Sequence, residues 1–250
     1  MIILKTSQEL SLMREAGRIT GGALAAGMEA CKPGATTMDV NRAVHHFITS
    51  HGAVPSFLGY GGFPAAACVS VNDEVIHGIP SKKRILREGD IVSIDVGACF
   101  KGYHGDSAAT VGVGAISAEA QQLLDVTARS LEMGIAQALK GNRIGDIGAA
   151  VQQYAESFGY GVVRDFVGHG IGTNVHEDPE VPNYGRAGRG PRLMPGMTIA
   201  IEPMINLRGA DVEVQPDGWT VLTASGSLSA HFEHTVAITD NGPVVLTTRP

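Results

Sequence analysis

A single shift of 107 residues, which carries position 95 onto position 202, aligns the two halves of this 250-residue chain. The matched pairs are Leu24 with Leu131, Gly27 with Gly134, Gly34 with Gly141, Asp39 with Asp146, Ala43 with Ala150, Val44 with Val151, Gly89 with Gly196 and Ile94 with Ile201. Because one register covers helix, turn and strand positions, it predicts an internal duplication, about 7–116 and 117–240. A chance match between segments of common composition is the alternative.

The local patterns fit such a repeat, because each half contains two helices followed by strands. Thr6 with Glu9 and Thr36 with Asp39 are typical of capping boxes at helix starts. We expect helices from 7 toward 32, from 37 to 51, from 117 to 139 and from 144 to 158, and strands over 67–71, 90–96, 108–113, 162–167, 197–201 and 233–238. The fold class is therefore α/β (α+β), one body of two pseudo-symmetric halves in a single domain, 1–250.

Composition narrows the range of functions. A hydrophobic content of 44% is enough for a sizeable core, and a net charge of −6 with one short basic run at 82–84 argues against a nucleic-acid surface. The chain shows neither the apolar segment of a signal peptide nor a membrane-spanning stretch, and Cys31, Cys68 and Cys99 lack CxxC spacing. We therefore expect a cytoplasmic protein with reduced thiols.

Acidic residues lie where a strand pattern disfavours them. Asp95 falls in an apolar run, Asp106 on the returning strand, Glu202 where the apolar strand of "IAIEPM" ends and Glu233 where that of "HFEHTVAIT" begins. Together with His169 of "FVGHGIG" they form a set of four carboxylates and one imidazole, and like charges cannot share a pocket without cations. Ordinary strand-end capping is the alternative for each residue alone. As a set, these residues predict a hydrolase site for two divalent ions about 3.5–4 Å apart.

The remaining histidines differ in their context. His77 precedes Gly-Ile-Pro and His176 lies in "VHEDP", both in predicted loops, so either could donate a hydrogen bond to a substrate amide or an oxyanion. A turn-capping role is the alternative for either residue taken singly. His104, His231 and His234 lie close to the predicted ligands, and we expect them only to orient carboxylates.

Five segments, read in order, resemble the type I methionine aminopeptidases from Ser7 to Leu246. They are "VNDEVIHGIP", "IVSIDVGACFKGYHGDSAAT", "FVGHGIGTNVHEDP", "TIAIEPM" and "SLSAHFEHTVAIT". The resemblance implies the pita-bread fold, an antiparallel sheet flanked by helices. It also implies that Asp95, Asp106 and Glu233 hold one ion and that Asp106, His169, Glu202 and Glu233 hold the other. The two ions would be Co, Mn, Fe or Zn.

The resemblance further implies removal of the initiator methionine from nascent proteins when the second residue is small, with a metal-bridging hydroxide as the attacking group. His77 would meet the substrate's N-terminal region, His176 the scissile amide, and Glu202 would move protons. A methionine-specific enzyme needs an apolar slot for a thioether. By resemblance its walls include Tyr60, Phe63, Cys68 and Trp219.

Departures from the family pattern fall at three positions. Val175 replaces an aromatic residue of many bacterial relatives, Phe57 a Cys of some, and His231 a common Gln. An N-terminal extension with zinc-binding motifs is absent from this sequence. We expect the partners to be nascent N-termini beginning with Met, with ribosome association, no nucleic acid, no membrane and a monomeric state. The rival interpretations are a proline-directed peptidase of the same fold and a binding protein that has lost its metals.

Overall fold

Four helices frame the structure, a computed structural model that describes residues 1–249. They are α1 (Ser7–Ala30), α2 (Thr37–Ser50), α3 (Ala118–Gln137) and α4 (Ile144–Glu156). Both predicted capping boxes are present: the Thr6 and Thr36 side chains accept hydrogen bonds from the backbone amides of Glu9 and Asp39, whose carboxylates accept in return. The four helices were therefore correctly predicted from local pattern.

The strands of the first half form an antiparallel sheet around a long hairpin. Strand β4 (Ile91–Phe100) pairs with β5 (Tyr103–Gly112), β2 (Ala67–Val71) and β1 (Val54–Pro55). The hairpin turns at Lys101 and Gly102, whose φ angles of +49° and +83° suit a tight β-turn. Because β4 extends to Phe100, beyond the predicted end at 96, Asp95 lies in the middle of the strand.

The second half contributes most of the remaining strands, and some of these were not predicted. One sheet orders β15 (Gly242–Val245), β14 (His234–Thr239), β9 (Thr198–Ile201), β7 (Gly168–Gly170) and β8 (Glu177–Val181). Another orders β13 (Ser229–His231), β10 (Met204–Asn206) and β6 (Gly161–Val162), and a third orders β11 (Val212–Val214), β12 (Val221–Thr223) and β3 (Glu74–Ile76). The single strand predicted over 162–167 is wrong: β6 ends at Val162, and Phe166 and Val167 line a cavity instead.

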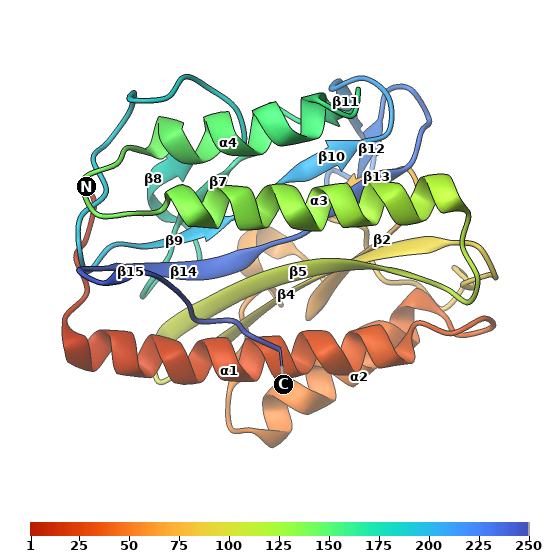
Figure 1. The fold of residues 1–250 in the computed structure, drawn as a ribbon. Helices are drawn as coiled ribbons and strands as arrows, with labels where there is room; N and C mark the ends of the chain where they lie inside the picture. Colours follow the sequence, from red (N-terminus) through yellow and green to blue (C-terminus); the bar gives the residue numbers. More distant parts are fainter. Residues whose placement is uncertain (250) are drawn as a thin grey trace.

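The helices cover the sheets on the side that faces the viewer in Figure 1, with α1 below and α3 above. Helix α1 contacts β4 and β5, and α3 contacts β9, β10 and β13. The two halves meet where β14 contacts β5.

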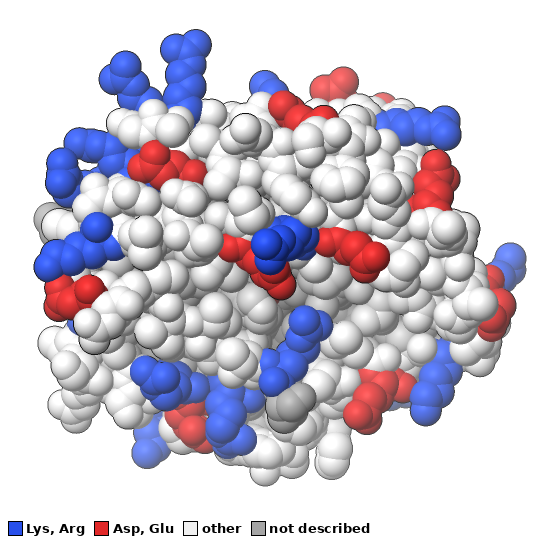
Figure 2. Space-filling view, in the orientation of Figure 1, with Lys and Arg blue, Asp and Glu red and all other residues white. Residues whose placement is uncertain are grey.

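On the face drawn in Figure 2, acidic and basic side chains are interspersed over these elements. Among residues 1–249, no helix is long and apolar enough to cross a membrane.

The packing of α1 against α2 matches the packing of α3 against α4. Gly27 on α1 and Gly134 on α3 each lie where a side chain would collide with the partner helix and touch the strand beneath. The atoms that a Cβ would meet are Val44 Cγ2 (2.9 Å) and Ile94 Cγ2 (3.3 Å) at the first glycine, and Val151 Cγ2 (2.8 Å) and Ile201 Cγ2 (3.5 Å) at the second. These residues are related by the 107-residue shift. The internal duplication remains a prediction, and this packing supports it.

Candidate metal centre

The junction between the halves brings distant segments together through side-chain hydrogen bonds. Thr235 Oγ1 accepts from the Asp106 amide at 2.9 Å and donates to the Asp106 carbonyl at 2.8 Å. Ser107 Oγ donates to the Glu233 carbonyl at 2.8 Å, and the Glu233 amide donates to the Ala108 carbonyl at 2.9 Å. The loop between β13 and β14 is thereby held against β5, so that Glu233 lies next to Asp106. Ser107 and Thr235 were not singled out by sequence reasoning, because nothing local distinguishes them.

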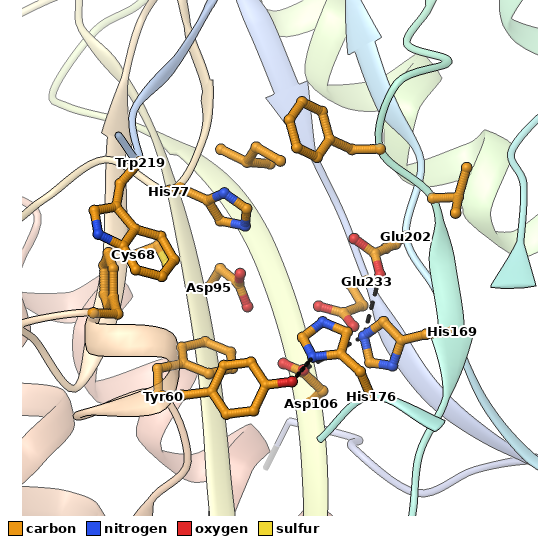
Figure 3. A pocket seen from close by; sticks show the side chains of 15 residues that line it. Tyr60, Cys68, His77, Asp95, Asp106, His169, His176, Glu202, Trp219 and Glu233 are labelled. Carbon is orange, nitrogen blue, oxygen red and sulfur yellow. Dashed lines mark hydrogen bonds and ion pairs between the residues drawn. The ribbon is translucent and has the colours of Figure 1, made fainter. Parts of the chain in front are cut away.

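All five predicted ligands line one cavity (Figure 3). Asp95 and Asp106 lie on neighbouring strands, two residues apart in the β4–β5 register, so their side chains share a face. One donor atom each from Asp106, His169 and Glu233 lies within 4.8 Å of the others. Glu202, directly after β9, places Oε1 3.5 Å from His169 Nε2. The five residues predicted as ligands are therefore brought together, and their roles as ligands remain a proposal.

Burial and mutual repulsion raise the pKa values of the four acids. The pKa of Asp95 rises to about 7, mainly because burial disfavours its charged form. The pKa values of Asp106, Glu202 and Glu233 rise well above their ordinary values, through burial first and then through the charges of neighbouring acids. Within residues 1–249, no Lys or Arg forms an ion pair with any of them. Among the described residues, no Lys or Arg side chain therefore balances these carboxylates when they are ionised.

Unsatisfied atoms in this cluster fit bound cations. Asp95 Oδ1, Asp106 Oδ1 and Glu233 Oε1 are buried and have no hydrogen-bond partner. Buried polar atoms normally have partners, so this clustering calls for a cation. His169 suits the same purpose: its Nδ1 donates to the Gly170 carbonyl at 2.9 Å, which leaves Nε2 unprotonated and facing the carboxylates. Burial lowers the pKa of His169 to about 4, so the ring is neutral at neutral pH.

The two loop histidines border the same cavity. The His176 ring lies 4.1 Å from that of His169, and its Nδ1 is 2.8 Å from Tyr60 Oη. His77 has a left-handed backbone (φ +59°) and packs edge-on against Phe166 and Trp219. Burial lowers the pKa of His77 to about 4 and also lowers that of His176. Both rings are therefore neutral near pH 7, when each can offer one N–H donor.

An apolar wall completes the cavity. A buried cluster contains Phe57, Phe63, Ala65, Cys68 and Val175, and Trp219 packs against it. The Phe63 and Trp219 rings meet edge to face at 5.1 Å, and Tyr60 lies at the exposed border of the pocket. The two departures at Phe57 and Val175 thus fall in the same buried cluster, and Phe57 also lines the cavity. Ile76, Phe166 and Val167 also line the cavity and were not assigned to it from sequence.

Of the three histidines expected to orient carboxylates, one lies against a predicted ligand. His231 is 2% exposed and its Nε2 is 3.7 Å from Glu202 Oε2. His104 Nδ1 instead pairs with Ser56 Oγ at 2.8 Å, and His234 Nδ1 pairs with Thr247 Oγ1 at 2.9 Å. The departure from Gln at position 231 therefore changes a side chain that faces Glu202. All three cysteines are free thiols.

The fold and this carboxylate–histidine cluster define a metal-dependent hydrolase. The chain matches the profile of metallopeptidase family M24 over residues 11–240, and it belongs to that family. It is 57% identical over 247 residues to a methionine aminopeptidase of Clostridium acetobutylicum, with 99% of each chain covered. It is 50% identical over 247 residues to methionine aminopeptidase 1 of Bacillus subtilis, again with 99% of each covered.

Solved structures agree with this assignment. A methionine aminopeptidase from Thermotoga maritima superposes with a TM-score of 0.98 at 45% identity and covers 100% of both chains. A prolidase from Pyrococcus furiosus has a TM-score of 0.80 at 25% identity, and the match covers 99% of this chain and 66% of that one. Within family M24, this chain groups with the type I methionine aminopeptidases, and the predicted pita-bread fold is confirmed.

Proposed function

We propose that this chain is a metal-dependent methionyl aminopeptidase, which removes the N-terminal methionine of nascent proteins whose second residue is small. One observation carries the proposal: a buried Asp106–His169–Glu233 group, with donor atoms within 4.8 Å of one another, borders an apolar pocket. High identity over the whole chain to relatives named methionine aminopeptidase supports the substrate class. The preference for a small second residue follows the family resemblance.

The residues fit two divalent ions, because two buried and two half-buried acids meet one neutral imidazole and several of their oxygens lack partners. Asp95, Asp106 and Glu233 would hold one ion, and Asp106, His169, Glu202 and Glu233 the other, from among Co, Mn, Fe and Zn. Such ions lower the pKa of water to near neutrality and polarise a carbonyl group. Asp106 and Glu233 would be shared by both ions.

The chain's own residues bind the substrate and move protons. The wall of Phe63, Cys68 and Trp219, with Tyr60 at its border, would receive the methionine side chain. His77 would meet the substrate's N-terminal region, and the neutral His176 would donate to the carbonyl oxygen of the scissile amide. Hydrolysis adds water across this amide, and Glu202 would take the proton from the water and return it to the leaving amine.

The proposal also covers the location of the enzyme, its oligomeric state and its association with the ribosome. The three free cysteines suit a reducing compartment, so we propose that the enzyme acts in the cytoplasm on nascent chains. We also propose a monomer with one catalytic domain, built as a duplicated unit whose matched glycine packing was described above. Ribosome association follows from the nascent substrate and is tested by co-sedimentation with translating ribosomes.

Peptide hydrolysis tests the activity directly. Chelator-treated protein is assayed with a Met-Gly-x peptide and an x-Pro peptide, before and after each divalent ion is restored. We expect cleavage of the methionyl bond only after an ion is added. Cleavage confined to the x-Pro peptide would support a proline-directed peptidase, and activity in rigorously metal-free protein would contradict a metal mechanism. Inactivity with every ion would support a binding protein.

A further inference from the structure

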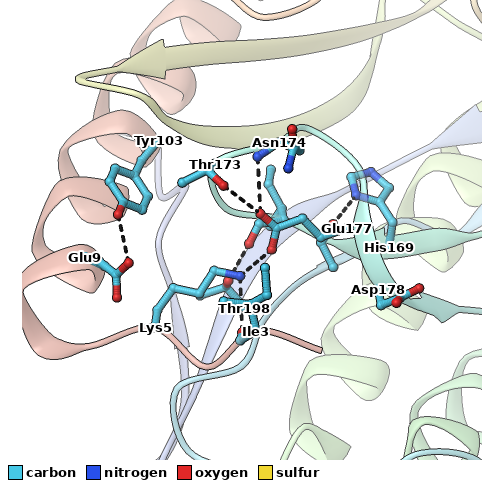
Figure 4. Close-up of polar contacts among 12 residues, drawn as sticks. Ile3, Lys5, Glu9, Tyr103, His169, Thr173, Asn174, Glu177, Asp178 and Thr198 are labelled. Atoms are coloured by element: carbon cyan, nitrogen blue, oxygen red, sulfur yellow. Dashed lines mark hydrogen bonds and ion pairs between the residues drawn. The ribbon is translucent and has the colours of Figure 1, made fainter. Parts of the chain in front are cut away.

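A buried ion pair joins the segment before α1 to the loop that carries His176 (Figure 4). Lys5 Nζ lies 2.5 Å from Glu177 Oε2, and each side chain is 4% exposed. The two residues are 172 positions apart in the sequence. Burying two charges costs several kcal/mol unless additional hydrogen bonds satisfy them. A pair buried to this extent is therefore expected only where the surrounding structure supports it.

The supporting hydrogen bonds come from the loop itself. Glu177 Oε1 accepts from the Asn174 amide at 3.2 Å and from Thr173 Oγ1 at 3.4 Å. Lys5 Nζ also donates to the Ile3 carbonyl at 3.3 Å. The Glu177 carboxylate thus closes the loop on itself with one oxygen, while its other oxygen ties the loop to Lys5.

Lys5 is anchored on its other side to the sheet. Its backbone amide donates to the Gly196 carbonyl at 2.7 Å, and the Gly196 amide donates to the Ile238 carbonyl at 3.0 Å. Gly172 lies directly on the ion pair, because a Cβ there would lie 2.4 Å from Lys5 Cε and 2.6 Å from Glu177 Oε1. The loop therefore rests against the ion pair, and a side chain at position 172 would have to displace the ends of Lys5 and Glu177.

This loop, residues 171–176, connects two groups at the cavity. It follows His169 on β7 and ends with His176, the residue directly before Glu177. The β7–β8 register shifts between His169 and Gly170, so the sheet ladder alone does not fix the path of the loop. The two histidine rings nevertheless lie 4.1 Å apart. Contacts outside the strand pairing therefore contribute to this arrangement, among them the hydrogen bond from the His104 amide to the Gly172 carbonyl at 2.9 Å and the contact of His176 Nδ1 with Tyr60 Oη at 2.8 Å.

We propose that Lys5 and Glu177 are positioning residues, whose buried ion pair fixes loop 171–176 and thereby the orientation of the His176 ring beside His169. In this inference, the catalytic importance of His176 rests on the proposed function. The ordering of the loop by the ion pair is a separate claim that a structural measurement tests.

The test compares Lys5→Met with Lys140→Met, which breaks the exposed Lys140–Asp240 pair and serves as the matched control. Hydrogen exchange of the 171–177 amides is followed in metal-free protein, and kcat and KM are measured on a Met-Gly peptide after metal is restored. For Lys5→Met we expect roughly 10-fold or faster exchange confined to the loop and a kcat lowered about 10- to 100-fold, the range for groups that orient site residues. The control should match wild type.

Two more variants keep the result decisive. Lys5→Arg keeps the charge and should restore most of the loop protection and kcat. If Lys5→Met does not fold, the double variant Lys5→Met/Glu177→Leu removes both buried charges together, which a fold generally tolerates. It should show the same loop exchange and loss of kcat.

Two outcomes overturn the inference: unchanged loop exchange with kcat within twofold of wild type, or faster exchange spread evenly over the whole protein. The His176→Ala variant separates the two claims. If it keeps wild-type kcat, the proposed role of His176 fails, whereas the loop exchange of Lys5→Met still decides whether the ion pair orders the loop.

Discussion

The Glu177 carboxylate, directly after loop 171–176, and the four acids of the metal centre resolve the same electrostatic problem in opposite ways. Burial acts to raise the pKa of Glu177, but the hydrogen bond from Lys5, with further help from the Asn174 amide, outweighs it, and the pKa is lowered. In the metal centre burial and the charges of Glu233 and Asp95 outweigh the hydrogen bond from the Ser107 amide, so the pKa of Asp106 is raised well above its usual range. The chain supplies its own cation at one site and leaves the other to ions from solution.

The largest expected effect is the loss of the acids proposed to bridge two ions. Asp106→Ala and Glu233→Ala should each lower kcat by ~10³-fold or more, because ion-based stabilisation of the transition state is worth several kcal/mol. His77→Ala, which removes one proposed hydrogen bond to substrate, should lower kcat about 10- to 100-fold. Steady-state assays with metal analysis of each variant check this. Equal modest losses in all three variants would contradict the bridging assignment.

Glu177→Gln should destabilise the fold by about 3–5 kcal/mol near neutral pH, because it leaves the Lys5 charge buried without its partner. Since the folded-state pKa of Glu177 is lowered, its ionised form stabilises the protein above its ordinary pKa of 4.5, and this contribution disappears as pH falls. Urea titrations from pH 4 to 7 measure the difference from wild type, with Asp240→Asn as the exposed control. A difference that grows toward acid pH would contradict the pairing.

The metal centre should show the opposite pH dependence. The pKa of Asp95 is raised from 3.8 to about 7, so in metal-free protein its stabilising contribution is complete below pH 4 and is lost as pH rises through 7. Asp95→Asn should therefore gain roughly 2 to 4 kcal/mol relative to wild type between pH 4 and 8. Urea unfolding of both chelated proteins tests this. A difference independent of pH would show that Asp95 has no raised pKa.

The smallest effect concerns His231, which is neutral because burial and His77 lower its pKa to about 3. His231→Leu should lower kcat by about 10-fold, since it removes an imidazole whose Nε2 lies 3.7 Å from Glu202 Oε2. His231→Gln restores an N–H donor and should recover most of that loss. Kinetics of the two variants decide the matter, and wild-type kcat in the Leu variant would leave His231 without a role at Glu202.

Local chemistry explains which elements could be predicted. The capping pairs at Thr6 and Thr36 set two helix starts directly, and the hydrophobic periodicity predicted all four helices. Strands of three residues such as β10–β13 were missed, because their pairing depends on distant partners rather than on local alternation. The run 162–167 resembled a strand, yet Val162 and Val163 are buried in hydrophobic clusters while Phe166 and Val167 line the cavity.

The sequence by itself determined the chemistry: acids in apolar strands, one histidine among glycines and an apolar set for the pocket. Only the tertiary structure brought these residues together, because the hydrogen bonds between Thr235 and Asp106 join residues 129 positions apart in the sequence. It also decided that Lys5 neutralises Glu177 and no acid of the metal centre. Hydrophobic patterns report which face of an element is buried, whereas the partner of a buried charge depends on distances that only the packed chain fixes.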